Sequence, residues 1–265
     1  MTAAAFEVPM DATLTLERTA NASKILSIDH VTVSFDGFKA VDDLSMSIEE
    51  NELRVIIGPN GAGKTTLLDM ICGKTRPTSG SIRFREVELT KLAEFEIVRR
   101  GVGRKFQNPS IYEDLTVREN LEISIPQAHG IWASILFKRT PQVRERIGAV
   151  AEQVMLADHL QTRSAKLSHG QKQWLEIGML LMQEPALMLL DEPVAGMSAR
   201  EREATAELLR RIAAGRALVV IEHDMGFVRS IAHRVTVLHQ GKVLAEGSMD
   251  AVQCDPRVVD VYLGH

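Results

Sequence analysis

The stretch from Val55 to Leu68 constrains the fold of this chain more than any other segment. It consists of a short apolar run, a turn with glycine at positions 58, 61 and 63, and then a helical pattern. Glycines let a backbone turn tightly with its N–H groups pointing inward, and the start of the next helix offers an anion further N–H donors and a positive dipole. The segment therefore predicts a phosphate cradle between a strand and a helix.

Two side chains at the start of that helix add chemistry to the cradle. Lys64 can reach terminal phosphates, and Thr65 can ligate Mg²⁺. The alternative is that Lys64 is a solvated surface charge, but a lysine in a first helical turn opposes the helix dipole and needs a compensating anion. The predicted nucleotide-binding residues of the loop are Gly58, Pro59, Asn60, Gly61, Ala62, Gly63, Lys64, Thr65 and Thr66. Many unrelated NTPases share this motif, so the kind of NTPase must follow from the rest of the chain.

Composition limits the remaining possibilities. The 265 residues are 45% hydrophobic and 25% charged, which is typical of a globular protein with a sizeable core. A net charge of −4 gives no support for binding nucleic acid through the overall field. The two cysteines, Cys72 and Cys254, have no metal-ligand spacing and suit a reducing compartment. The longest apolar runs are too short to span a bilayer, so any work at a membrane would go through partners.

The N-terminal part predicts an extension followed by a strand pair. Residues 1–24 show no sustained periodicity and predict a flexible extension. Residues 25–35 alternate between apolar and polar, turn at Asp36 and Gly37, and resume over residues 40–48, which indicates an antiparallel pair. Phe35 lies where an aromatic ring can stack on a nucleotide base, with Phe38 as a competing candidate. The alternative for Phe35 is a place in the core.

The middle of the chain changes character. From Leu89 to about Arg163 the pattern is mostly helical, and we interpret residues 107–163 as a helical insertion into an α/β core. The basic run that precedes it, Arg99, Arg100, Arg104 and Lys105, indicates a solvated helix face rather than a nucleic-acid patch. Trp132 and Phe137 lie in an apolar segment of this insertion, where they either pack its own core or contact a partner.

The second half returns to alternating strands and helices. Ser168 and Gln171 have the spacing of a capping box before a helix that runs through Met182. Residues 186–190 and 218–221 are uninterrupted apolar runs, typical of parallel strands buried on both faces. They end in Asp191 and Glu192, and in residues 222–224, at the sheet edge where α/β proteins bind ligands. A charged helix over residues 199–213 and a hairpin over residues 235–245 complete the pattern.

In this order the motifs resemble those of ATP-binding subunits of ABC transporters, and the resemblance covers the chain from about Ile25 onward. Residues 58–66 match the Walker A loop, residues 167–171 the signature motif, and residues 187–191 the Walker B strand. The single-residue matches are Gln107 for the Q-loop glutamine, Glu192 for the catalytic glutamate and His223 for the switch histidine. The resemblance implies an α/β P-loop NTPase core of RecA-like type, with an N-terminal antiparallel β subdomain and an inserted helical subdomain, all within residues 25–265.

The resemblance also implies how the chain acts. It would bind ATP and Mg²⁺, with Thr65, Gln107 and Asp191 at the metal and with Glu192, His223 and Gln107 as catalytic residues. Ser168, Gly170 and Gln171 would bind ATP held by a facing subunit, so that two ATP-binding chains, the same or related, form a head-to-tail dimer. Hydrolysis would power solute import through membrane permeases on the cytoplasmic face of the inner membrane, with a periplasmic solute-binding protein delivering the solute and no nucleic acid involved.

Finer resemblances suggest a solute. Residues 99–107 and 175–178 resemble the branched-chain amino acid type of importer, whereas residues 168–176, 192–197 and 260–264 look like the urea transporter ATP-binding subunit. We therefore expect urea or a short amide, with a branched-chain amino acid as the alternative. A soluble ABC ATPase, such as an iron–sulfur assembly factor, is the alternative from another class.

The chain departs from the family pattern at two positions. His169 stands where many relatives have glycine, and Ser198 stands where aspartate is usual in the D-loop. Because the signature turn is expected to act through Ser168 and backbone N–H groups, the sequence predicts that glycine is tolerated at position 169.

Overall fold

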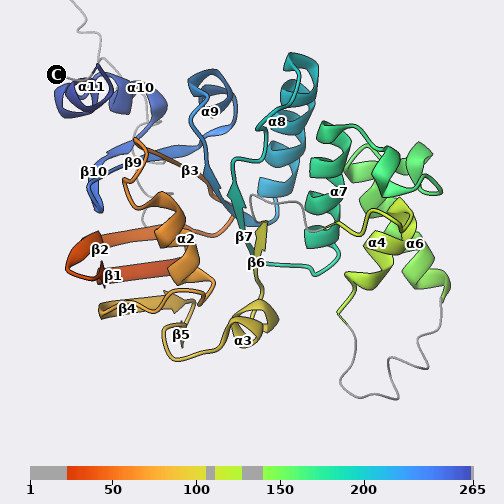
Figure 1. The fold of residues 1–265 in the computed structure, drawn as a ribbon, viewed down its shortest axis with the longest axis horizontal. Coiled ribbons are helices and arrows are strands. Elements are labelled where there is room, and N and C mark those ends of the chain that lie inside the picture. The colour runs from red at the N-terminus through yellow and green to blue at the C-terminus, as the bar shows by residue number, and fades with distance from the viewer. Residues whose placement is uncertain (1–22, 106–110, 127–139, 264–265) are drawn as a thin grey trace, which may run out of the picture.

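The computed structural model describes residues 23–105, 111–126 and 140–263, and two sheets organise them. Figure 1 shows an antiparallel sheet at one end, a mostly parallel sheet in the middle and a group of helices at the other end. The strands are β1 (Lys24–Phe35), β2 (Phe38–Glu49), β3 (Leu53–Ile57), β4 (Ser79–Phe84), β5 (Val87–Glu88), β6 (Val102–Lys105), β7 (Leu187–Asp191), β8 (Ala217–Ile221), β9 (Arg234–His239) and β10 (Lys242–Gly247). The α/β fold class predicted from the sequence is confirmed.

Helices connect and cover these sheets. They are α2 (Lys64–Ile71), α3 (Glu94–Arg99), α4 (Val117–Ile123), α6 (Pro141–Gln153), α7 (His169–Leu181), α8 (Ala199–Ala213), α9 (Met225–Ile231), α10 (Met249–Gln253) and α11 (Pro256–Leu263), with short 3₁₀ turns at Ala157–His159 and Ser164–Lys166. Across the ranges that the structure describes, no helix has the length and apolarity needed to cross a bilayer.

The antiparallel sheet has the order β2-β1-β4-β5. Its first hairpin is the predicted one: Phe35 pairs with Phe38, and the turn between them has positive φ at Asp36 and Gly37. One face of this sheet, with Ile28, Val31 and Leu44, packs in a core that also contains residues of α2. The sheet therefore lies beside the helix that follows the predicted phosphate loop.

The central sheet has the order β10-β9-β3-β8-β7-β6, with parallel pairing everywhere except at β10. Strands β3, β7 and β8 are buried at every position, so their alternate side chains enter two different cores. Ile56 packs with the antiparallel sheet and α2, whereas Val55 and Ile57 pack with helices on the opposite face. This two-sided burial explains why the strands read as continuous apolar runs.

The interpretation of the basic run as a solvated helix face is wrong for Arg104 and Lys105. Both lie in β6, the edge strand of the parallel sheet, and their side chains are buried. Arg104 Nη1 is 2.5 Å from Asp69 Oδ1, and Lys105 Nζ is 3.3 Å from Glu176 Oε2. Since each buried cation faces a carboxylate, the strand tolerates charges that a sequence pattern assigns to the surface.

Helices α4, α6 and α7 contact one another at the end of the molecule away from the antiparallel sheet (Figure 1). The two ends of the segment that holds α4 and α6 run side by side: Val117 N donates to Thr162 O at 3.0 Å, and Ser164 N donates to Leu115 O at 2.9 Å. Adjacent ends are what an insertion into another domain requires. The boundaries at 107 and 163 stay a prediction, and Gln107, Trp132 and Phe137 lie outside the described residues.

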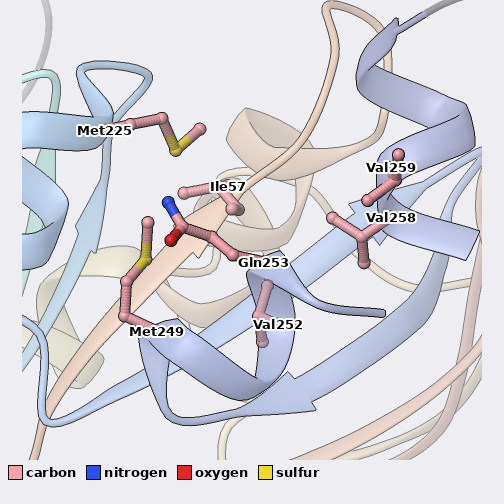
Figure 2. A pocket seen from close by; sticks show the side chains of 7 residues that line it. All are labelled: Ile57, Met225, Met249, Val252, Gln253, Val258 and Val259. Atoms are coloured by element: carbon pink, nitrogen blue, oxygen red, sulfur yellow. The ribbon is translucent and has the colours of Figure 1, made fainter. Parts of the chain in front are cut away.

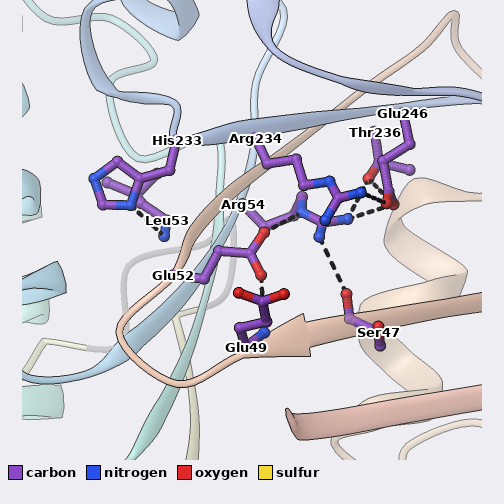
Figure 3. A network of polar contacts seen from close by, with 9 residues as sticks. All are labelled: Ser47, Glu49, Glu52, Leu53, Arg54, His233, Arg234, Thr236 and Glu246. Atoms are coloured by element: carbon purple, nitrogen blue, oxygen red, sulfur yellow. Dashed lines mark hydrogen bonds and ion pairs between the residues drawn. The ribbon is translucent and has the colours of Figure 1, made fainter. Parts of the chain in front are cut away.

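Arg54 is a buried charge in the middle of the otherwise apolar strand β3. Its side chain is 1% exposed and donates to Glu52 and Glu246 at 2.5 Å each. It also donates to Thr236 Oγ1 at 2.8 Å and to the Ser47 carbonyl at 3.1 Å. As Figure 3 shows, Ser47 comes from β2, whereas Thr236 and Glu246 come from β9 and β10, so one guanidinium joins the two sheets.

We predict that Arg54→Ala strongly destabilises the fold. Removing the cation leaves the Glu52 and Glu246 carboxylates without their partner, and breaking a buried ion pair on one side costs about 3–5 kcal/mol. The matched control is Arg83→Ala, whose exposed pair with Glu88 is 3.6 Å long and should contribute less than about 1 kcal/mol. Urea unfolding of both variants measures the difference, and equal small losses would contradict the prediction.

Candidate nucleotide-binding site

The predicted phosphate loop connects β3 to α2, and its glycines are required by close packing. Gly58 has φ +150° and Gly63 has φ +96°. A Cβ on Gly58 would lie 2.2 Å from the Leu238 carbonyl oxygen, and one on Gly63 would lie 2.5 Å from the Ala40 carbonyl oxygen. Only glycine fits at these two positions, because both the backbone angle and the contact exclude a side chain.

The loop borders a cavity of about 270 Å³. The cavity is lined by Phe38, Ala40, Asn60, Gly61, Ala62, Gly63, Lys64, Thr65, Thr66, Asp191, Glu192 and Ile221. Lys64 Nζ donates to the carbonyls of Gly58 at 2.7 Å and Pro59 at 2.9 Å, which folds the side chain back over the loop. Burial lowers the pKa of the Lys64 ammonium, while Glu192 and Asp191 act in the opposite direction. An ammonium held among weaker neutral acceptors is well placed for an anionic phosphate.

Asp191 ends β7 and brings a buried carboxylate to the same cavity. It is 2% exposed, and its Oδ1 atom has no hydrogen-bond partner among the described residues. Burial raises the pKa of Asp191, although Arg104, 3.8 Å from Oδ2, partly offsets this. This unpartnered buried oxygen belongs to a residue that lines the same cavity as Thr65, and such a pair of oxygen donors fits a hard cation such as Mg²⁺.

The wider ligand set also suits magnesium. No group of three His, Cys, Asp or Glu side chains forms a metal site within the described ranges. Mg²⁺ is usually held by one or two carboxylates together with waters and substrate phosphates, so Asp191 and Thr65 suffice on the protein side. The predicted third ligand, Gln107, lies outside the described residues.

Glu192 lines the cavity, and His223 lies beside Glu192. Their side chains follow β7 and β8, and His223 Nδ1 lies 3.5 Å from Glu192 Oε1. Glu192 is 33% exposed and has φ +47°, a strained angle for a residue with a side chain. Its backbone N–H donates to the Ile221 carbonyl at 3.0 Å, which ties this turn to the neighbouring strand. The arrangement can orient a water molecule near the phosphate loop.

Glu222 and Arg104 support the site, and the sequence analysis assigned no role to either. Glu222 is buried at the end of β8 and accepts from the backbone N–H groups of Val194 at 3.3 Å and His223 at 3.2 Å. Burial raises its pKa. Glu222 directly follows a buried apolar run, and the same sequence pattern predicted Asp191 as a site residue. The sequence around Arg104 is instead a basic run, which predicted a solvated helix face.

Ser168, Gly170 and Gln171 lie elsewhere, at the N-terminus of α7, and none of them lines the cavity. The predicted capping box is present: the Ser168 hydroxyl accepts from Gln171 N at 3.2 Å, and Gln171 Oε1 accepts from Ser168 N at 2.9 Å. Ser168 Oγ also donates to Glu201 Oε1 at 3.3 Å. These residues therefore present an edge of the chain that is separate from its own phosphate loop.

The two candidate stacking residues differ in position. Phe35 and Phe38 face each other across the first hairpin and are both exposed, at 51% and 67%. Phe38 lines the cavity, whereas Phe35 is not among its lining residues. The geometry thus favours Phe38, the competing candidate, over Phe35 as the residue that contacts a base.

A second hollow of about 260 Å³ has a different character. Figure 2 shows it between Ile57, Met225, Met249 and the C-terminal helices, with Gln253 as the one polar side chain among the described residues that line it. None of these described lining residues carries a charge suited to a phosphate. The cavity beside the phosphate loop is therefore the candidate nucleotide site.

Family models agree with this geometry. Residues 41–195 match the model described as ABC transporter. Residues 242–265 match the model described as branched-chain amino acid ATP-binding cassette transporter. The first match covers more than half of the chain, from β2 through Asp191 and the turn that follows it.

Individual relatives match almost the whole chain. The branched-chain amino acid transport ATP-binding protein LivG of Salmonella typhimurium is 33% identical over 251 residues, 91% of this chain and 98% of the relative. BraF of Pseudomonas aeruginosa is 33% identical over 250 residues, with the same coverage. A crystal structure of the ADP conformation of MJ1267, an ATP-binding cassette of an ABC transporter, superposes with a TM-score of 0.81 at 30% identity, covering 91% of this chain and 99% of that one. The chain belongs to the ATP-binding subunits of ABC transporters, of the branched-chain amino acid type, and is an ATPase of that family.

Proposed function

We propose that the chain hydrolyses ATP at the cavity beside Lys64 and thereby powers solute import through permease subunits. The observation that carries this proposal is that the phosphate loop, Asp191 and Glu192 line one cavity, with His223 Nδ1 3.5 Å from the Glu192 carboxylate. The loop follows β3, Asp191 ends β7 with Glu192 directly after it, and His223 lies just after β8. Together these groups supply what phosphoryl transfer to water requires.

The residues divide this chemistry between them. Lys64 and the loop N–H groups would hold the phosphates, and Thr65 and Asp191 would hold Mg²⁺, whose charge would offset that of the phosphate oxygens. Glu192 would orient or deprotonate the attacking water. His223, whose Nδ1 atom lies 3.5 Å from Glu192 Oε1, would contact the γ-phosphate. Gln107 is proposed to complete the metal shell.

A second ATP-binding chain completes each site in this proposal. The chain's own cavity is not lined by Ser168, Gly170 or Gln171, which lie at the N-terminus of α7. This position supports their action on ATP bound by a facing subunit. A cassette of the same fold, at 24% identity and a TM-score of 0.70, was solved as a dimer with ADP and phosphate. Two such chains would enclose two ATP molecules head to tail.

The solute is proposed from the relatives, because no residue of an ATPase subunit touches it. LivG and BraF are named for high-affinity transport of branched-chain amino acids, which favours that solute class here. Urea or a short amide is the second candidate, supported by the resemblance of residues 168–176 and 192–197 noted above. In either case the chain would bind permeases at the cytoplasmic face of the inner membrane and receive solute from a periplasmic binding protein.

The solute assignment is tested on the purified complex. We expect membrane permeases to co-purify with the chain, and the binding protein of the same system to stimulate ATP hydrolysis only with its own ligand. Isothermal titration of that binding protein with leucine, isoleucine, valine and urea then identifies the solute. Binding of urea alone would overturn the branched-chain assignment, and co-purification with soluble scaffold proteins would overturn transport.

Asp191→Asn should raise the stability of the nucleotide-free protein and lower its rate of ATP hydrolysis. The native carboxyl has a raised pKa, so its charged form destabilises the fold at neutral pH, and this cost fades as pH falls through the native pKa. Removing the charge should therefore raise the melting temperature measured without nucleotide at pH 7, while Arg104 keeps its partner Asp69. Hydrolysis should fall by roughly 100-fold or more, because the metal loses its carboxylate.

The matched control for this prediction is Asp250→Asn, which changes a carboxylate whose side chain is 82% exposed. It should leave both the melting temperature and the hydrolysis rate unchanged. A lower melting temperature for Asp191→Asn, or full hydrolysis by that variant, would contradict the assignment of Asp191.

Glu192→Gln should bind MgATP, hydrolyse it at least about 100-fold more slowly, and accumulate as a nucleotide-dependent dimer. Glutamine keeps the shape of the turn but loses the carboxylate that activates water, and it removes a negative charge that faces the γ-phosphate. Light scattering after size-exclusion chromatography, with and without MgATP, measures the dimer. Replacing Ser168 by a bulky residue as well should abolish it.

Two outcomes would count against parts of this scheme. A monomer under all conditions would exclude pairing of this chain with itself and indicate a different ATP-binding partner. Normal hydrolysis by Glu192→Gln would remove Glu192 from the mechanism.

A further inference from the structure

His169 makes a contact that a glycine at this position could not make. It is the first residue of α7, next to Ser168, and its side chain is exposed. The ring crosses to the turn that follows Glu192, where His169 Nε2 lies 2.9 Å from the carbonyl oxygen of Ala195. A carbonyl oxygen only accepts hydrogen bonds, so Nε2 must carry the proton and donate it.

The turn is shaped to receive this ring. Gly196 follows the accepting carbonyl with φ +71°, an angle that favours glycine. A Cβ at Gly196 would lie 3.1 Å from His169 Nε2 and 3.2 Å from Cδ2, so the ring packs directly against the bare backbone. The imidazole of His169 therefore both donates to the Ala195 carbonyl and packs against the backbone of Gly196.

The same turn holds Glu192. Ala195, whose carbonyl accepts from His169, donates its own N–H to the Glu192 carbonyl at 3.2 Å. Glu222 accepts from Val194 N at 3.3 Å and so anchors the turn from the inner side. His169 supports it from the outer side. Glu192 has a left-handed backbone conformation that neighbouring contacts must maintain. The contacts made by Glu222 and His169 therefore both influence the direction of the Glu192 carboxylate.

We propose that His169 is a positioning residue for ATP hydrolysis: through the Ala195 carbonyl it holds the turn that orients Glu192. The proposal rests on the proposed role of Glu192 as the residue that activates water. It extends that role by linking the signature turn, where His169 lies, to the hydrolytic carboxylate of the same chain. It also replaces the expectation from sequence that glycine is tolerated at position 169.

The test uses three substitutions in the complete transporter complex. His169→Ala removes the donor and should lower kcat for ATP about five-fold, the effect expected of one lost hydrogen bond, with KM unchanged within about two-fold. His169→Gln carries an N–H₂ donor at a similar reach and should restore most of the rate. His169→Asn is the matched control, because its amide is polar but too short, and it should behave like alanine.

Several results would overturn the proposal. One is a wild-type kcat for His169→Ala, and another is an equal loss in the Ala, Asn and Gln variants, which would indicate a need for the ring itself. A change in KM at constant kcat would instead place His169 on the nucleotide. Glu192→Gln, measured in parallel, distinguishes failure of the His169 proposal from failure of the proposed role of Glu192. If Glu192→Gln is inactive while His169→Ala is fully active, only the His169 proposal fails. If Glu192→Gln is active, both proposals fail.

Discussion

The parallel pairing of β3, β8 and β7 decides where the groups of the site lie. These three strands are neighbours in the sheet, and their carboxyl ends meet at one edge. The phosphate loop, Glu222 with His223, and Asp191 with Glu192 each begin where one of these strands stops. Burial on both faces fixes the register, because a slip by one residue would exchange the side chains that enter the two cores. The hydrophobic effect thus positions the polar residues of the site.

The buried charged groups of the site reduce the stability of the folded state. Burial raises the pKa of Asp191 and of Glu222 and lowers that of Lys64, so each charged form is less stable here than in water. The carboxylates of Glu192 and Asp191 partly offset the effect of burial on Lys64, and Arg104 adds a positive charge beside Asp191. A Mg²⁺ ion with nucleotide phosphates would complete the compensation. Ligand binding and stability are therefore coupled at this edge of the sheet.

Sequence reasoning worked where one physical rule dominated. Period and apolarity located β7, β8 and α8, and glycine spacing located the phosphate loop, because buried strands and tight backbone turns admit few residue types. It failed at β6, where Arg104 and Lys105 are buried against acids that lie far away in sequence. Which of Phe35 and Phe38 contacts a base stays a prediction; the folded hairpin adds that Phe38 lines the cavity, and no local sequence pattern encodes that. The role of Arg54 likewise depends on three other strands.

The contacts of α7 add a mechanical consequence to this picture. In one chain, the signature turn and the turn that carries Glu192 are joined twice, by His169 to Ala195 and by Glu201, which accepts from both Ser168 at 3.3 Å and Ser198 at 2.7 Å. A shift of the helical end of the molecule that moved α7 would therefore act on the turn beside Glu192. If Ser168, Gly170 and Gln171 of one chain bind ATP held by the other, closure over that ATP would also shift the Glu192 carboxylate in the chain's own site. The two sites would then be coupled through hydrogen bonds within each chain as well as through contacts between chains.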